Sequence, residues 1–246
     1  MHHPKPRHTR RHFSAQLLGL LSLCTLGLPH LAQAQEQPAA LAPAPTAAPA
    51  RLLIVGDSIS AEYGLARGQG WVALLEQRLQ TQGLPVTVVN ASLSGETTSG
   101  ARARLPALLK AHQPRYVVIE LGGNDALRGL PLPHTRDNLR AMIDAAHAAS
   151  ARTLLLGIQV PPNYGAQYSR DFAAVFTQAA EQSGAALVPF MLEAISAPDD
   201  VQTYFQPDRI HPNAAAQPLI LDTVWPAVRA LLTAPQSQPA QNHQSK

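Results

Sequence analysis

Five short apolar segments recur along the chain, and a longer helical pattern separates each from the next. None of the five alternates polar with apolar residues, which is typical of strands buried on both faces of a parallel sheet. Strands that alternate with helices in this way predict a three-layer α/β/α sandwich around a five-stranded parallel sheet. The predicted strands are 52–55, 86–89, 116–121, 153–158 and 186–188.

The helical patterns place apolar residues three to four positions apart, so that they share one face. The last helix is predicted over 214–232, where Pro218 and Pro226 should interrupt or kink it because proline lacks the backbone N–H. The other four faces are Trp71, Leu74, Leu75 and Leu79; Leu105, Leu108 and Leu109; Leu139, Met142, Ile143 and Ala146; and Phe172, Val175, Phe176 and Ala179.

The two ends of the chain lack this pattern. Lysine and arginine precede a short apolar run at 13–28, and Leu31-Ala32-Gln33-Ala34 offers a small-x-small cleavage site before Gln35, as in secretory signal peptides. The run is too short for a stable membrane span. We therefore predict a signal peptide over 1–34, a Pro/Ala-rich linker over 35–50, one folded domain over 51–233 and a disordered tail over 234–246.

Removal of the signal peptide would change the charge of the chain. Lys5, Arg7, Arg10 and Arg11 would leave with it, so that 15 basic residues face 16 acidic ones and the net charge becomes −1 with His neutral. No basic stripe remains to bind nucleic acid. The single cysteine, Cys24, would be lost too, which excludes disulfides and thiol chemistry. We expect a periplasmic or secreted protein, exported by the general secretory route rather than the twin-arginine route.

Small and polar residues follow the predicted strands, at the sheet edge where parallel sheets bind ligands. Serine hydrolysis needs a hydroxyl nucleophile, an imidazole base and a carboxylate that orients the base; the candidates are Ser58, His211 and Asp208. The developing oxyanion needs preorganised donors, for which the N–H groups of Ser58 and Gly95 and the side-chain amide of Asn124 are candidates. The segments are Gly56-Asp57-Ser58, the loop around Gly95, Gly122-Gly123-Asn124-Asp125 and Asp208-Arg209-Ile210-His211.

Taken in order, these segments resemble the four sequence blocks of the SGNH hydrolase (GDSL-like lipase/esterase) family. Residues 90–98 and 161–165 further resemble its periplasmic acyl-thioesterase/lysophospholipase/arylesterase branch, in which the loop after the fourth strand is a mobile lid lining the acyl groove. Ile59 stands where the family has Leu, and Glu96 and Arg209 where relatives often have Asp and Gly, which leaves the substrate preference open.

The resemblance implies a flavodoxin-like fold and hydrolysis of acyl esters or thioesters through an acyl-enzyme. It implies no metal or other cofactor, and a small acyl-ester, thioester or lysophospholipid as the substrate. Separately, we expect a monomer. Possible groove residues are Pro162, Asn163, Tyr164 and Tyr168, although both tyrosines could equally serve only to pack the loop.

Other polar residues near the blocks are expected to have structural roles. Asp57 should hold the nucleophile turn, and Asp125 should support the Asn124 loop. The remaining residues are expected in turns or at helix starts (Ser60, Ser92 and Ser94) or in contact with solvent (His112, His134, His147 and His243).

Two alternatives from other classes remain. A metal-dependent phosphoesterase also places Gly-Asp and Gly-Asn-Asp at strand ends, but it needs several His and carboxylate ligands, and the chain has no Asp-x-His. A non-catalytic periplasmic binding domain would have no use for a base and its orienting carboxylate. Within the serine hydrolases, the α/β-hydrolase fold is disfavoured because no Gly-x-Ser-x-Gly follows a strand.

Overall fold

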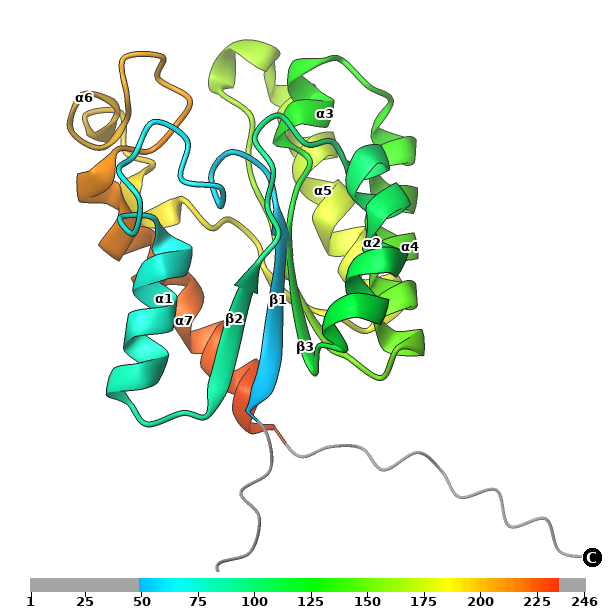
Figure 1. The fold of residues 1–246 in the computed structure, drawn as a ribbon. Helices are drawn as coiled ribbons and strands as arrows, with labels where there is room; N and C mark the ends of the chain where they lie inside the picture. Colours follow the sequence, from blue (N-terminus) through cyan, green and yellow to red (C-terminus); the bar gives the residue numbers. More distant parts are fainter. Residues whose placement is uncertain (1–48, 235–246) are drawn as a thin grey trace, which may run out of the picture. The chain divides into compact units, whose positions relative to one another are not determined.

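A computed structural model describes residues 49–234, which form an α/β/α sandwich around a five-stranded, wholly parallel sheet (Figure 1). The strand order is β2-β1-β3-β4-β5, so β3 lies at the centre between β1 and β4. The predicted fold class is confirmed. The strands are β1 (Ala50–Gly56), β2 (Val86–Asn90), β3 (Tyr116–Glu120), β4 (Arg152–Leu156) and β5 (Ala186–Val188).

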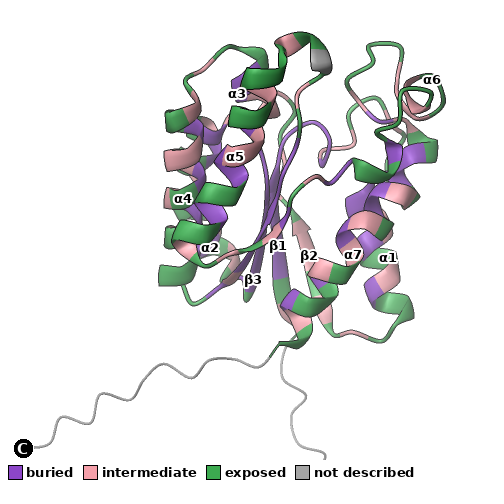
Figure 2. Ribbon diagram, turned by 180° about the vertical axis from the view of Figure 1, so that it is seen from behind, coloured by how far each residue is buried: buried purple, intermediate pink, exposed green. Residues whose placement is uncertain are grey.

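Helices cover both faces of the sheet. Figures 1 and 2 show α1 and α7 on one face and α2, α4 and α5 on the other. The predicted apolar faces pack inward: Trp71, Leu139 and Phe172 are fully buried. The long helices are α1 (Trp71–Thr81), α2 (Thr98–His112), α4 (Leu132–Ala148), α5 (Ala166–Ser183) and α7 (Gln217–Thr233).

Short helical segments that the sequence patterns did not indicate occupy the loops. Of these, α3 matters most, because it begins inside the Gly-Gly-Asn-Asp block. A helix of one turn is too short to show an apolar period, which explains why it was missed. These segments are α3 (Gly123–Leu127), α6 (Asp200–Tyr204), η1 (Pro162–Tyr164), η2 (Glu193–Ile195) and η3 (Ala214–Ala216).

Two expectations about the sheet were wrong. The strands β2 and β5 are not buried on both faces, because each lies at an edge of the sheet and is only partly covered. Strand β1 begins at Ala50, which had been assigned to the linker, because the N–H of Ala50 donates to the carbonyl oxygen of Pro85 beside β2.

The prolines of the last helix do not interrupt it. Pro218 lies in the first turn of α7, where a missing N–H costs nothing, and Pro226 lies inside a helix that is continuous to Thr233. A short 3₁₀ turn, η3, precedes it. The expected interruption is therefore wrong.

The predicted signal peptide and nearly all of the predicted linker and tail lie outside the described residues. Within residues 49–234, no helix combines the length and apolar character needed to cross a bilayer.

Candidate active site

The nucleophile candidate lies in a tight turn at the end of β1, an interior strand next to the central β3. The Asp57 carboxylate accepts a hydrogen bond from the N–H of Ile59 (3.1 Å), and the Asp57 carbonyl accepts one from the N–H of Ala61 (2.9 Å). Gly56 is needed there, because a Cβ would lie 2.8 Å from the Ser60 side chain and 2.9 Å from Glu120 Oε2. This packing fixes the backbone of Ser58, a residue that remains 9 % exposed.

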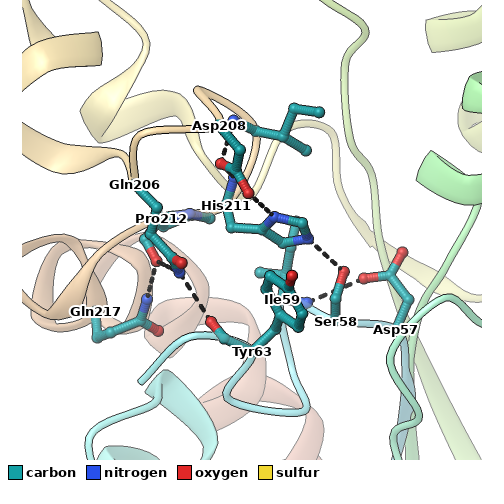
Figure 3. Close-up of polar contacts among 10 residues, drawn as sticks. Asp57, Ser58, Ile59, Tyr63, Gln206, Asp208, His211, Pro212 and Gln217 are labelled. Carbon is teal, nitrogen blue, oxygen red and sulfur yellow. Dashed lines mark hydrogen bonds and ion pairs between the residues drawn. The ribbon is translucent and has the colours of Figure 1, made fainter. Parts of the chain in front are cut away.

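The structure brings His211 and Asp208 to Ser58 from a loop 150 residues further along the chain. His211 Nε2 lies 2.9 Å from Ser58 Oγ, and His211 Nδ1 lies 2.6 Å from Asp208 Oδ2 (Figure 3). The other oxygen of Asp208 accepts the backbone N–H groups of Ile210 and His211, each at 3.0 Å. Hydroxyl, imidazole and carboxylate thus stand in the order that a catalytic triad requires.

The charge of Asp208 is held by its hydrogen bonds. Partial burial raises the pKa of this carboxyl, but the side-chain bond from His211 and the two backbone N–H groups outweigh it, so the pKa lies below its usual value. Asp208 is therefore ionised at neutral pH and can stabilise an imidazolium.

The loop of His211 is tied directly to the loop of Ser58. The rings of Tyr63 and His211 pack with centroids 4.4 Å apart, and the Gln206 side chain donates to the Tyr63 carbonyl (2.8 Å) (Figure 3). The Gln206 N–H also donates to the His211 carbonyl (2.8 Å). These contacts limit the movement of the imidazole relative to the serine.

The three candidate oxyanion donors come from three segments at the same sheet edge. Asn124, in α3, donates one N–H of its amide to Asp57 Oδ2 (3.1 Å), which leaves the second N–H of that amide for a substrate. Among hydrogen bonds between described residues, none is donated by the backbone N–H of Ser58 or Gly95. Gly95 has a φ of 78°, which favours glycine.

Hydrogen bonds at two places hold the Gly95 loop against α3. On the buried side, Asp125 accepts the N–H (2.9 Å) and the hydroxyl (2.5 Å) of Thr98. On the exposed side, Arg128 donates to the Gly95 carbonyl (2.8 Å). The hydrogen bonds from Thr98 support the predicted role of Asp125. The contact of Arg128 was not predicted from the sequence.

The buried carboxyl of Glu120, which the sequence analysis did not identify, holds the nucleophile turn by hydrogen bonds. It is the last residue of β3 and pairs in register with Gly56. Its Oε2 accepts the Ser60 hydroxyl (2.8 Å) and the Asp57 N–H (3.3 Å), and Ser60 in turn accepts the indole N–H of Trp71 (3.2 Å). The sequence signal was a lone carboxyl in an apolar run, directly before the glycine-rich block.

The same network reaches the histidine loop through Gln217. The Gln217 side chain accepts the backbone N–H of Trp71 (2.9 Å) and donates to the carbonyls of Asn213 (3.1 Å) and Pro212 (3.4 Å). A chain of buried hydrogen bonds therefore runs from the end of β3 to the residue next to His211.

Asp57 and Glu120 form a pair of buried carboxyls. Burial raises the pKa of Asp57 to about 6, although hydrogen bonds from Ile59 and Asn124 lower it in part. Burial and the nearby charge of Asp57 raise the pKa of Glu120 well above its usual value. Both groups therefore favour the uncharged acid more strongly in the folded chain than in the unfolded one.

This pair predicts a pH dependence of stability. Because the folded-state pKa of Asp57 is raised, the folded chain binds that proton more tightly, and the contribution of Asp57 to the free energy of unfolding should fall as the pH rises from about 4 to about 6. The contribution of Asp57 is at most about 3 kcal/mol. Urea unfolding of the wild type and of Asp57→Asn between pH 4 and pH 7 measures this contribution. The free energy of unfolding of the wild type should fall relative to that of the variant as the pH rises. A constant difference contradicts the assignment.

The predicted groove residues are placed only in part. The rings of Tyr164 and Tyr168 stack at 5.8 Å and those of Tyr168 and Phe172 at 6.3 Å, so Tyr168 packs against the core through α5. Asn163 is exposed, and Pro162 belongs to the turn η1. A lining role for these four residues stays a prediction.

Among residues 49–234, the other histidines belong to α2 and α4, and metal-binding side chains do not cluster. His112, His134 and His147 lie on α2 and α4, as expected, and His243 is outside the described residues. Across residues 49–234, no group of three or more His, Cys, Asp or Glu side chains could hold a metal ion. The donor set that a metal-dependent phosphoesterase requires is therefore not assembled in this part of the chain.

The comparisons with known proteins agree with this geometry. The model of the GDSL-like Lipase/Acylhydrolase family matches residues 54–218. The chain belongs to this family. Its members act on acyl esters, so the chain is an ester hydrolase, and the resemblance seen in the sequence is confirmed.

Three relatives illustrate the similarity. Esterase TesA of Pseudomonas aeruginosa is 53 % identical over 186 residues, covering 76 % of this chain and 91 % of that protein. Thioesterase 1/protease 1/lysophospholipase L1 of Escherichia coli K12 is 43 % identical over 194 residues, which cover 79 % of this chain and 86 % of that protein. The structure of the psychrotrophic esterase EstA of a Pseudoalteromonas species, inhibited by monoethylphosphonate, aligns with a TM-score of 0.69 at 42 % identity, covering 75 % of this chain and 99 % of that one.

Proposed function

We propose that the chain is a serine esterase in which Ser58 is the nucleophile, His211 the base and Asp208 its orienting partner. The observation that carries the proposal is the pair of short contacts made by one imidazole, 2.9 Å to Ser58 Oγ and 2.6 Å to Asp208 Oδ2. A serine hydroxyl is a weak nucleophile, and a base at hydrogen-bond distance is what activates it.

In the first half of the reaction, Ser58 Oγ attacks the carbonyl carbon of the ester while its proton passes to His211 Nε2. Asp208 stabilises the resulting imidazolium through Nδ1–H. The N–H groups of Ser58 and Gly95 and the free amide N–H of Asn124 donate to the oxyanion. The tetrahedral intermediate then collapses, the bond to the leaving alkoxide or thiolate breaks, and His211 returns the proton to that group.

In the second half, water attacks the acyl-enzyme. His211 takes one proton from the water and delivers it to Ser58 Oγ as the acid leaves. No cofactor takes part in this scheme, and one copy of the chain supplies every group. The substrates that we propose are acyl thioesters and lysophospholipids, by similarity to the named activities of the Escherichia coli relative, and aryl esters, by similarity to an arylesterase of Vibrio mimicus that is 42 % identical over 175 residues.

We further propose that the chain acts outside the cytoplasm, after cleavage of a signal peptide near Ala34. The support is the basic start, the apolar run at 13–28 and the small-x-small site.

Covalent labelling tests the assignment of the nucleophile. Incubation with a fluorophosphonate should add one adduct, mapped by mass spectrometry to Ser58, since the activated hydroxyl attacks the phosphorus and fluoride leaves. His211→Ala should not be labelled at a comparable rate, while Ser99→Ala, which alters an exposed serine in the first turn of α2, should label normally. An adduct on another serine, or none on a folded protein, contradicts the proposal.

A further inference from the structure

The large apolar side chains that remain exposed are not scattered over the molecule. Within residues 49–234 there are four, each between 42 % and 52 % exposed. Isolated exposed apolar residues are ordinary on protein surfaces, but a group at one place indicates an interaction site. The four, which we name the apolar rim, are Tyr63, Leu93, Leu127 and Ile210.

Every member of the apolar rim lies in a segment, either a loop or the short helix α3, that carries or adjoins a candidate active-site residue. The ring of Tyr63 packs on His211, and Ile210 is the residue before His211. The N–H of Leu93 donates to the carbonyl of Gly56 (3.0 Å), two residues before Ser58. Leu127 ends α3, the helix of Asn124. The four exposed residues therefore lie in the segments that bring the candidate site residues together at the carboxyl edge of the sheet.

In the same segments, the carboxylates and the arginines differ in how they are bound. Every carboxylate there is bound within the protein, to a side chain or to backbone N–H groups. Two exposed arginines directly adjoin members of the apolar rim: Arg209 precedes Ile210, and Arg128 follows Leu127. Arg128 donates one bond to a carbonyl, and Arg209 makes no side-chain hydrogen bond with any described residue. Their positive charge therefore faces solvent beside apolar side chains. The bound carboxylates are Asp57, Glu62, Glu96, Asp125 and Asp208.

Apolar side chains flanked by cations match the surface of a lipid aggregate with anionic headgroups, in which acyl chains lie beneath negative charge. We propose that the apolar rim, with Arg128 and Arg209, docks the enzyme on such a surface, so that an amphiphilic acyl ester enters the site from the lipid phase. The proposal rests on the proposed ester hydrolysis only for its purpose, because docking itself needs no turnover.

Sedimentation with vesicles tests the docking without catalysis. The exported protein, with its N-terminus determined so that residues 13–28 are known to be absent, carries Ser58→Ala so that no lipid is hydrolysed. Binding is compared on phosphatidylcholine vesicles and on an equimolar mixture of phosphatidylcholine and phosphatidylglycerol. We expect tighter binding to the mixture, weakened by added salt.

Single substitutions separate the two contributions. Leu93→Ser and Ile210→Ser should each lower the partition coefficient about fivefold on the mixed vesicles, since each removes apolar area from the contact. Arg209→Gln should lower it about fivefold on the mixed vesicles and leave the neutral ones unaffected. The matched control is Arg229→Gln, an exposed arginine near the end of α7, at the opposite edge of the sheet, which should change nothing.

Three outcomes overturn the proposal: no binding of the parent protein to the mixed vesicles, equal binding to both kinds, or an equal effect of Arg229→Gln and Arg209→Gln. A higher KM of Leu93→Ser or Ile210→Ser for a monomeric ester, with vesicle binding unchanged, also overturns it and makes the apolar rim a site for a single acyl chain. Labelling of Ser58 by fluorophosphonate is independent of all these results, so failure of docking and failure of the proposed hydrolysis are distinguishable.

Discussion

Ser58→Ala is expected to lower kcat for a soluble aryl ester by a factor on the order of 10⁴–10⁶, and His211→Ala by a similar factor. The reason is that the two side chains act as one unit across the 2.9 Å contact between Oγ and Nε2. Without the hydroxyl there is no acyl-enzyme, and without the imidazole the hydroxyl keeps its proton. Initial rates with a chromogenic ester measure the effect.

The double variant is the sharper test of that unit. Ser58→Ala/His211→Ala should be about as slow as either single variant, because the second change removes a group that has already lost its partner. Independent contributions would instead multiply. Ser99→Ala serves again as the control and should keep the wild-type rate, since this serine is exposed in α2. Activity of Ser58→Ala within tenfold of the wild type excludes the serine mechanism.

Asn124→Ala is expected to lower kcat by a factor on the order of 10²–10³ while KM changes little. The amide would donate to an oxygen that becomes negative only in the transition state, so its loss weakens transition-state binding more than substrate binding. Steady-state kinetics with one soluble ester separate kcat from KM. A loss confined to KM contradicts the oxyanion role.

A matched change separates this role from support of the nucleophile turn. Asn124 also donates to Asp57 Oδ2 (3.1 Å), so Asn124→Ala removes that bond as well. Asp57→Asn disturbs the same bond from the other side but leaves the Asn124 amide in place. Its loss of kcat should be about tenfold smaller than that of Asn124→Ala. Equal losses would assign the effect to the turn.

The layers of the fold were predictable because each depends on local patterns. Apolar runs near all five strands and apolar faces on four of the five long helices were visible in the sequence, and the interior strands β1 and β3 have the expected two-sided burial. The edge positions of β2 and β5 were not visible, because a short apolar run has the same pattern at an edge of a sheet as at its centre. Pro226 misled because helix packing tolerates what local propensity disfavours.

The sequence by itself determined which residue types could form the site, since Ser58, Gly95, Asn124 and the Asp208–His211 pair each follow a strand or precede a helix in a distinct block. Only the tertiary structure decided that His211 Nε2 meets Ser58 Oγ, across 153 positions of the chain. It also decided that Glu120, which no pattern in its apolar run marked, contacts the nucleophile turn, because the register of β3 with β1 pairs Glu120 with Gly56. The physical reason is that local sequence sets backbone preferences, whereas contacts between distant segments follow from how the parallel strands align and bury their shared core.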